Sequence, residues 1–235
     1  MDHGREFGRV VSEALNSVAV ASRDLRQQHE SGEVVLRSQL CEGLYWLMPR
    51  LSGFYQKYPD IPVRVTVSTK PLAESEERFD LALQTSGRQQ GDTKQIFTAS
   101  DEVFPVCSPA YLDGETLPLS MDRLNGLHLL HHKVEPQDWV SWEAWLARQG
   151  IDLQIGTDGT VFDSYPMMIQ AMLEGHGVAL AWRRTIDSYL NAGTVVRPFE
   201  ERLCLPDGLS IYQPTGWQVR HGTSELLEWL KLELS

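Results

Sequence analysis

One cysteine and two histidines are candidates for a nucleophile and its general base. Cys41 follows an apolar run and opens a predicted helix. A helix N-terminus lowers a thiol pKa and favours the nucleophilic thiolate. His131 and His132 close another apolar run, and either could serve as the base. A thiol-dependent hydrolase is therefore one hypothesis, but nothing in the spacing requires it, and we predict no catalytic residue.

Three polar stretches lie at predicted strand ends or helix starts. In open parallel sheets, ligands bind at the carboxyl ends of strands, where helix N-termini offer free N–H groups to an anion. Each stretch alone is as well explained by a cap or turn bonded to its own backbone. Together they predict a pocket for a small ligand. Its predicted contacts are Ser38, Gln39, Cys41, Gln84, Thr85, Ser86, Phe162, Asp163 and Ser164, with His131 as a further polar contact.

Alternating strands and helices are predicted to position these loops. The first half reads as strand 34–38, a helix up to Tyr58 with Pro49 in its first turn, strand 61–68 with Val67 facing inward, a short polar helix at 70–78, and strands 79–83 and 102–107. An early proline is tolerated in a helix because its missing N–H has no partner there. Alternation of strands and helices predicts a parallel sheet.

The same pattern restarts after residue 107. It predicts strands at 127–130, 177–182 and 195–199, and helices at 165–174, 186–190 and 223–230. A further helix carries Trp139, Trp142 and Trp145, whose spacing places Trp142 and Trp139 in the core and leaves Trp145 partly exposed. Residues 210–212 are predicted to lead back to the first half.

The N-terminal segment, residues 1–30, reads as a separate helix that needs a partner. Its apolar residues follow spacings of 4, 3, 4, 3 and 4, which is the seam of a coiled coil. We expect this narrow stripe to pair with a second copy of the chain, and the alternative is an amphipathic helix docked on its own domain. The seam residues are Phe7, Val11, Ala14, Val18, Ala21 and Leu25.

Composition excludes several classes of protein. The 235 residues are enough for a substantial core, and 3 widely spaced cysteines make neither a disulfide framework nor a zinc site. The net charge of −11 makes bare duplex DNA a poor partner. No 18 apolar residues follow one another and no secretory signal opens the chain. We predict a cytoplasmic protein without membrane contact, metal or cofactor.

Several motifs in register resemble one family. They are Leu47-Met48-Pro49-Arg50-Leu51, Phe79-Asp80-Leu81-Ala82-Leu83, Phe104-Pro105-Val106-Cys107-Ser108-Pro109, Trp142-Glu143-Ala144-Trp145 and Gly175-His176-Gly177-Val178-Ala179-Leu180. The series resembles the effector-binding domain of LysR-type transcriptional regulators, in the subgroup of the glycine cleavage activator, and it spans essentially the whole chain. Cys41 falls about where relatives often carry a pocket serine.

The resemblance implies an α/β, periplasmic-binding-protein-like (type II) fold, with two α/β subdomains around a cleft and a long linker helix before them. Residues 31–106 and 208–235 would form subdomain I, and 107–207 subdomain II. It implies a small-molecule effector in the cleft, a homodimer or homotetramer, and DNA contact only through a winged helix-turn-helix that these residues do not include. The polarity of the predicted pocket favours an anionic, carboxylate-like effector as a hypothesis. A stand-alone solute-binding protein of the same fold is the main alternative.

Overall fold

The computed structural model describes residues 32–235 except residues 76, 135–138, 154, 156–158 and 217–219. The predicted pairing helix, with its seam from Phe7 to Leu25, lies outside the described residues. Within them, no helix is long and apolar enough to cross a bilayer.

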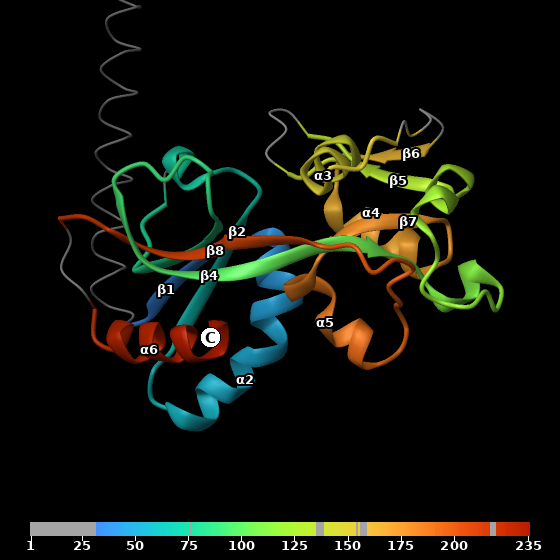
Figure 1. Cartoon of the computed structure of the whole chain (residues 1–235). Helices are drawn as coiled ribbons and strands as arrows, with labels where there is room; N and C mark the ends of the chain where they lie inside the picture. Colours follow the sequence, from blue (N-terminus) through green and yellow to red (C-terminus); the bar gives the residue numbers. More distant parts are fainter. Residues whose placement is uncertain (1–31, 76, 135–138, 154, 156–158, 217–219) are drawn as a thin grey trace, which may run out of the picture.

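One mixed sheet of eight strands organises the chain (Figure 1). Its order is β2-β1-β3-β8-β4-β7-β5-β6. The strands are β1 (Val34–Gln39), β2 (Val63–Ser68), β3 (Leu81–Thr85), β4 (Thr93–Val106), β5 (Leu129–His132), β6 (Gly159–Phe162), β7 (Val178–Trp182) and β8 (Leu203–Pro214).

Helices and single turns of helix connect the strands. The regular helices are α2 (Met48–Lys57), α3 (Trp142–Gln149), α4 (Tyr165–Leu173), α5 (Arg183–Asn191) and α6 (Thr223–Leu234). The π-helix η1 (Glu42–Leu47) runs directly into α2, and the 3-10 turns are η2 (Leu72–Glu74), η3 (Pro109–Leu112) and η4 (Met121–Gly126). Pro49 lies in the first turn of α2, as predicted.

Two long strands cross between the halves of the molecule (Figure 1). β1 pairs in parallel with β2 and β3, and β5 with β6 and β7, which matches the predicted parallel units. β4 and β8 instead run antiparallel to each other over most of their length and to the strands they join. The prediction of a parallel sheet was therefore wrong for the strand at 102–107, which is part of β4. The pairing of β4 and β8 links positions about a hundred residues apart and leaves no local pattern.

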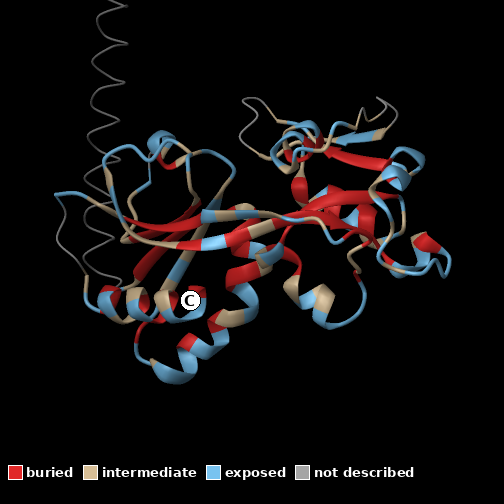
Figure 2. Cartoon of the chain, viewed as in Figure 1, coloured by how far each residue is buried: buried red, intermediate tan, exposed pale blue. Residues whose placement is uncertain are grey.

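Most buried apolar residues form two large clusters, one in each half (Figure 2), and Leu72, Ala82 and Tyr212 form a small third one. The first combines residues 34–99 with residues 209–234, including Phe54 of α2 and Trp229 of α6. The second spans residues 103–199 and also takes in Cys41 from the start of η1. The corner between β1 and η1 therefore contributes to both cores.

Several local predictions need correction. Val67, predicted to face inward, is 52% exposed near the end of β2, the strand at one edge of the sheet. Trp145 is fully buried, since its indole Nε1 donates to the Val103 carbonyl 2.9 Å away in β4. The predicted polar helix at 70–78 shrinks to η2, and the predicted strand at 195–199 reduces to a bridge between Val196 and Cys107.

Candidate functional site

A cavity of about 930 Å³ lies between the two halves. The first half lines it with the end of β1, the start of η1 and the loops after β2 and β3. The second half contributes the end of β5 and the starts of α3 and α4. Small-ligand pockets commonly measure about 300 to 1,000 Å³. The cavity therefore has room for a metabolite held between the halves.

Four of the predicted contact residues line this cavity. Gln39 and Cys41 belong to the first half, and Asp163 and Ser164 precede α4 in the second. They meet because β1 and the strand preceding α4 both end at this face. The Gln39 side chain is also anchored, since its Oε1 accepts a hydrogen bond of 2.7 Å from the Thr85 backbone N–H.

Three of the remaining predicted residues serve the scaffold of the first half. Ser38 is buried and donates through Oγ to the Gln39 carbonyl. Gln84 is fully buried, and its Oε1 accepts from the Leu72 N–H at 2.8 Å, which fastens η2 to β3. The Ser86 hydroxyl lies 2.7 Å from that of Ser210 in β8.

Thr85, His131 and Phe162 are likewise absent from the cavity lining. The Thr85 hydroxyl donates to Glu42 Oε1 at 3.1 Å. His131 is buried against β6, where a Cβ on Gly159 would lie 2.7 Å from its Nε2. Burial lowers the pKa of this imidazole. Phe162 packs on the second core instead.

Cys41 does not have the character of a nucleophile. Its side chain is buried, and desolvation raises the pKa of its thiol well above the ordinary value, with the Glu42 charge acting in the same direction. The acidic residue that follows it, Glu42, opposes the lowering that a helix N-terminus would provide. The thiolate that a hydrolase would need is disfavoured here.

Charged residues from loops and from the first turn of α3 complete the lining, and the sequence analysis missed them. Lys70 and Arg88 stand on the first half, and Lys133 and Glu143 on the second. Arg88 is held in place, because its Nη2 donates to the Thr69 carbonyl at 2.9 Å. Lys133 directly follows β5, and Lys70 lies two residues after the end of β2. Their place at strand ends is the one signal that could have indicated them.

An aromatic cluster forms part of the second wall. Trp139 stacks on Tyr165 with ring centroids 4.9 Å apart and planes at 22°. His132 meets both rings edge-on, at 5.2 and 5.8 Å. All three residues line the cavity. His132 thus occupies the cleft position that the sequence analysis gave to His131, because neighbouring residues in β5 point to opposite faces.

Metal chemistry finds no support among the described residues. No three His, Cys, Asp or Glu side chains in this part of the chain gather as metal ligands. Cys41, Cys107 and Cys204 are all free thiols. The cleft instead offers hydrogen-bonding groups, both signs of charge and aromatic rings, which suits reversible binding of a small polar molecule.

Comparison with known proteins agrees with this geometry. The model of the LysR substrate binding domain matches residues 27–235. The glycine cleavage system transcriptional activator of Escherichia coli K12 is 28% identical over 202 residues, covering 86% of this chain and 65% of the relative. The transcriptional activator AmpR of Providencia stuartii is 28% identical over 211 residues, covering 85% and 65%. This chain thus spans about two thirds of the length of these relatives.

A solved structure supplies the matching fold. The effector domain of the regulator AmpR of Pseudomonas aeruginosa superposes with a TM-score of 0.68 at 20% identity, covering 85% of this chain and 93% of that one. The architecture is the periplasmic-binding-protein-like type II fold, as the sequence resemblance implied. With the family model matching nearly all of the described residues, the chain belongs to the LysR family of transcriptional regulators, in which it is the substrate-binding, or effector-binding, domain.

Proposed function

We propose that this domain senses a small metabolite carrying a carboxylate, bound in the cavity between the two halves, and thereby controls transcription by the regulator to which it belongs. The observation that carries the proposal is the 930 Å³ cavity with cationic side chains on both walls, Lys70 and Arg88 on one and Lys133 on the other. A ligand spanning the cavity contacts both halves at once and can fix their relative orientation.

Arg88 is the strongest support for an anionic group on the ligand. The positive charge of its guanidinium acts on the β1–η1 corner, where it lowers the pKa of both Cys41 and Glu42 against the larger effect of burial. Guanidinium groups bind carboxylates through two parallel hydrogen bonds. We expect the effector carboxylate to lie between Arg88 and Gln39, with Asp163 and Ser164 contacting its other end.

The remaining features of the proposal follow the family. Subdomain I would comprise residues 31–106 and 208–235, and subdomain II residues 107–207. The helix at 1–30 would pair two copies through its Phe7 to Leu25 seam. DNA contact would come through a winged helix-turn-helix of the longer regulator, and the protein would act in the cytoplasm. No turnover is proposed, which accords with the raised thiol pKa of Cys41.

Thermal unfolding against a panel of metabolites tests the proposal. Carboxylates, amino acids, amines and neutral sugars are added to the purified chain, and the midpoint temperature is followed together with the concentration of each compound. A ligand at 100 times its dissociation constant adds about 2.7 kcal/mol, which is a shift of several degrees. A saturable shift confined to amines or sugars would contradict a carboxylate ligand, and consumption of a compound would restore the enzyme hypothesis.

A matched pair of variants locates the binding site. Arg88→Gln is expected to weaken binding of the carboxylate found in the panel at least tenfold, since a charge-assisted hydrogen bond contributes about 1.5 to 3 kcal/mol. Arg148→Gln removes an exposed charge from the last turn of α3, outside the cavity, and should leave the dissociation constant unchanged. Equal effects of the two substitutions would place the ligand elsewhere.

A further inference from the structure

A buried carboxylate lies where the long strands cross from one half to the other. The register of β4 against β8 shifts between Ala99 and Asp101, and on the β8 side this shift falls between Leu209 and Leu205. Asp101 itself is buried. The two strands touch there, because a Cβ on Gly208 would lie 2.4 Å from the Asp101 Cβ. Rotation of one half against the other must therefore change the surroundings of Asp101.

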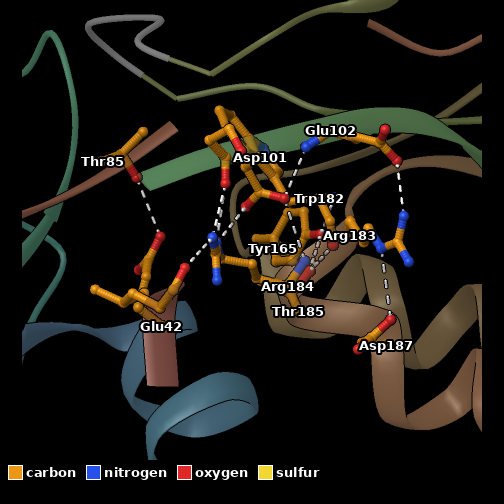
Figure 3. Close-up of polar contacts among 12 residues, drawn as sticks. Glu42, Thr85, Asp101, Glu102, Tyr165, Trp182, Arg183, Arg184, Thr185 and Asp187 are labelled. Carbon is orange, nitrogen blue, oxygen red and sulfur yellow. Dashed lines mark hydrogen bonds and ion pairs between the residues drawn. The ribbon is translucent and has the colours of Figure 1, made fainter. Parts of the chain in front are cut away.

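The carboxylate of Asp101 joins the crossing strand to α5 of the second half (Figure 3). Its Oδ1 accepts from the backbone N–H of Glu102 at 2.8 Å and from that of Arg184, in the first turn of α5, at 3.4 Å. Its Oδ2 lies 3.9 Å from Arg184 Nε. A carboxylate at a helix N-terminus also interacts favourably with the helix dipole.

Arg184 extends this connection to the first half. Its Nη2 donates to the Ser100 carbonyl at 2.8 Å and to the Leu234 carbonyl at 3.0 Å, and its Nε also donates to Ser100. One side chain of α5 thus bonds both β4 and the end of α6. The Asp101–Arg184 pair therefore bonds both halves to the crossing strand.

Other charges surround the pair and determine its protonation. The groups facing it are Glu42 of η1, Arg50 of α2, Glu102 of β4, Arg183 and Asp187 of α5, and Glu233 of α6, several of which line a cavity of about 360 Å³ beside the crossing. Most of these charges form ion pairs with one another. Arg183 lies 3.1 Å from Glu102 and 3.7 Å from Asp187, and Arg50 lies 3.7 Å from Glu233.

We propose that Asp101 is a proton-sensitive positioning residue of the hinge, whose ionisation shifts the relative orientation of the two halves. The inference goes beyond effector binding and needs no ligand. In the present arrangement burial raises the pKa of Asp101 to about 6, against opposing hydrogen bonds and the Arg184 charge. An arrangement that lets water reach this carboxylate returns its pKa towards the ordinary value. Protonation therefore favours the present arrangement, and ionisation favours an opened one.

Energy transfer between two dyes tests the proposal directly. Cysteines are placed at the exposed positions Lys57 in α2 and Arg148 in α3, in a Cys204→Ser background, because Cys204 is the exposed native thiol and Cys41 and Cys107 are buried. Labelled chains are mixed with excess unlabelled chain, so that only distances within one chain are read. The transfer efficiency should change between pH 5 and 7 with a midpoint near 6.

Three variants decide the outcome. Asp101→Asn should abolish the transition and keep the low-pH efficiency throughout, whereas Asp187→Asn, on the same helix, should retain it. Arg184→Met should move the midpoint to higher pH, because the charge that favours ionised Asp101 is lost. A constant efficiency in the unmodified chain, or the same transition in Asp101→Asn, overturns the proposal. Circular dichroism verifies that each variant is folded, and Arg184→Met keeps the test available should Asp101→Asn misfold.

Discussion

Two corners at which a strand leads into a helix, β1–η1 and β7–α5, pack against each other. Each contains a buried carboxylate, but the two carboxylates have different hydrogen-bond partners. In the β1–η1 corner, Glu42 opens the helix, hydrogen-bonds its own backbone N–H and accepts from Thr85. In the β7–α5 corner, the carboxylate at the helix start comes from Asp101 on another strand. The corners pack together, with Tyr45 of η1 edge-on to Tyr165 and Tyr189.

The difference lies in what each carboxylate connects. Both pKa values are raised by burial, so both acids are held in an unfavourable environment. The bonds of Glu42 remain within the first half, because Thr85 belongs to β3. The bonds of Asp101 cross between the halves. A buried acid placed within one half affects stability alone, whereas one placed at the crossing can also affect orientation.

The largest effect is expected from adding a side-chain atom at Gly208, where β8 lies directly against Asp101 of β4. In Gly208→Ala, the new Cβ would lie 2.4 Å from the Asp101 Cβ and 2.8 Å from its backbone N. Overpacking usually costs about 1 to 3 kcal/mol, and because backbone is involved we expect about 4 kcal/mol here. Urea unfolding measures the loss. Gly53→Ala in α2 is the control, since nothing lies within 4 Å of its Cβ position, and it should not destabilise. Equal stabilities would refute the close crossing.

The second largest effect is a pH dependence of the free energy of unfolding that arises from Asp101. Because the pKa of Asp101 is raised in the folded chain, its contribution to stability is fully present below pH 4 and is lost as the pH rises through about 6. Relative to Asp101→Asn, the unmodified chain should therefore lose on the order of 2 kcal/mol between pH 4 and 8. Unfolding free energies of the two chains across this range provide the measurement. A constant difference would contradict the raised pKa.

A smaller effect is expected from the hydroxyl that serves Glu42. Thr85→Val removes the donor to Glu42 Oε1 with little change of shape. Leaving a buried acceptor without this partner costs about 1 to 2 kcal/mol while the carboxylate is ionised. Because burial raises the pKa of Glu42, the cost should diminish as the pH falls, since a neutral carboxyl needs the donor less. Thr93→Val, which removes an exposed hydroxyl bonded to the Gln90 carbonyl, serves as the comparison. A cost that does not diminish at low pH would contradict the raised pKa of Glu42.

The smallest effect is expected from a partly exposed ion pair between α2 and α6. Arg50 lies 3.7 Å from Glu233, and both side chains are about one third exposed. Partly exposed pairs of this kind contribute about 0.2 to 1 kcal/mol. Arg50→Gln should therefore cost less than 1 kcal/mol in thermal unfolding, and the cost should shrink further in 0.5 M salt. A larger loss would show that the hydrogen bond from Arg50 Nη1 to the Trp46 carbonyl, 2.9 Å away, contributes more than the exposed ion pair.

Local patterns in the sequence predicted much of the scaffold. The early prolines, the glycine at position 150 and the apolar periodicity located α2, α3, α4 and α6, and runs of apolar residues located β1, β3, β5 and β7. The cavity residues Gln39, Cys41, Asp163 and Ser164 were predictable because they occupy junctions between elements. Junctions at strand ends face the same edge whatever the details of packing.

The rest depended on contacts between distant residues. Which of His131 and His132 faces the cavity depends on the face of β5 that is covered, and the run of apolar residues before them does not reveal it. Gln84 was predicted to contact the ligand, but its Oε1 accepts a hydrogen bond from the backbone N–H of Leu72 in η2. Asp101 stands in a polar segment whose burial is decided by β8, about a hundred residues later.

The return of β8 has a consequence for synthesis on the ribosome. The second core needs residues 103–199 together with Cys41, and these are all available once the chain has passed Phe199. The first core also needs Leu209, Ile211 and the apolar face of α6, including Trp229 and Leu234 at the end of the described chain. We therefore expect the second half, whose residues are synthesised before the first half is complete, to fold first. The N-terminal strands would then wait, partly unpaired, for the last residues to emerge.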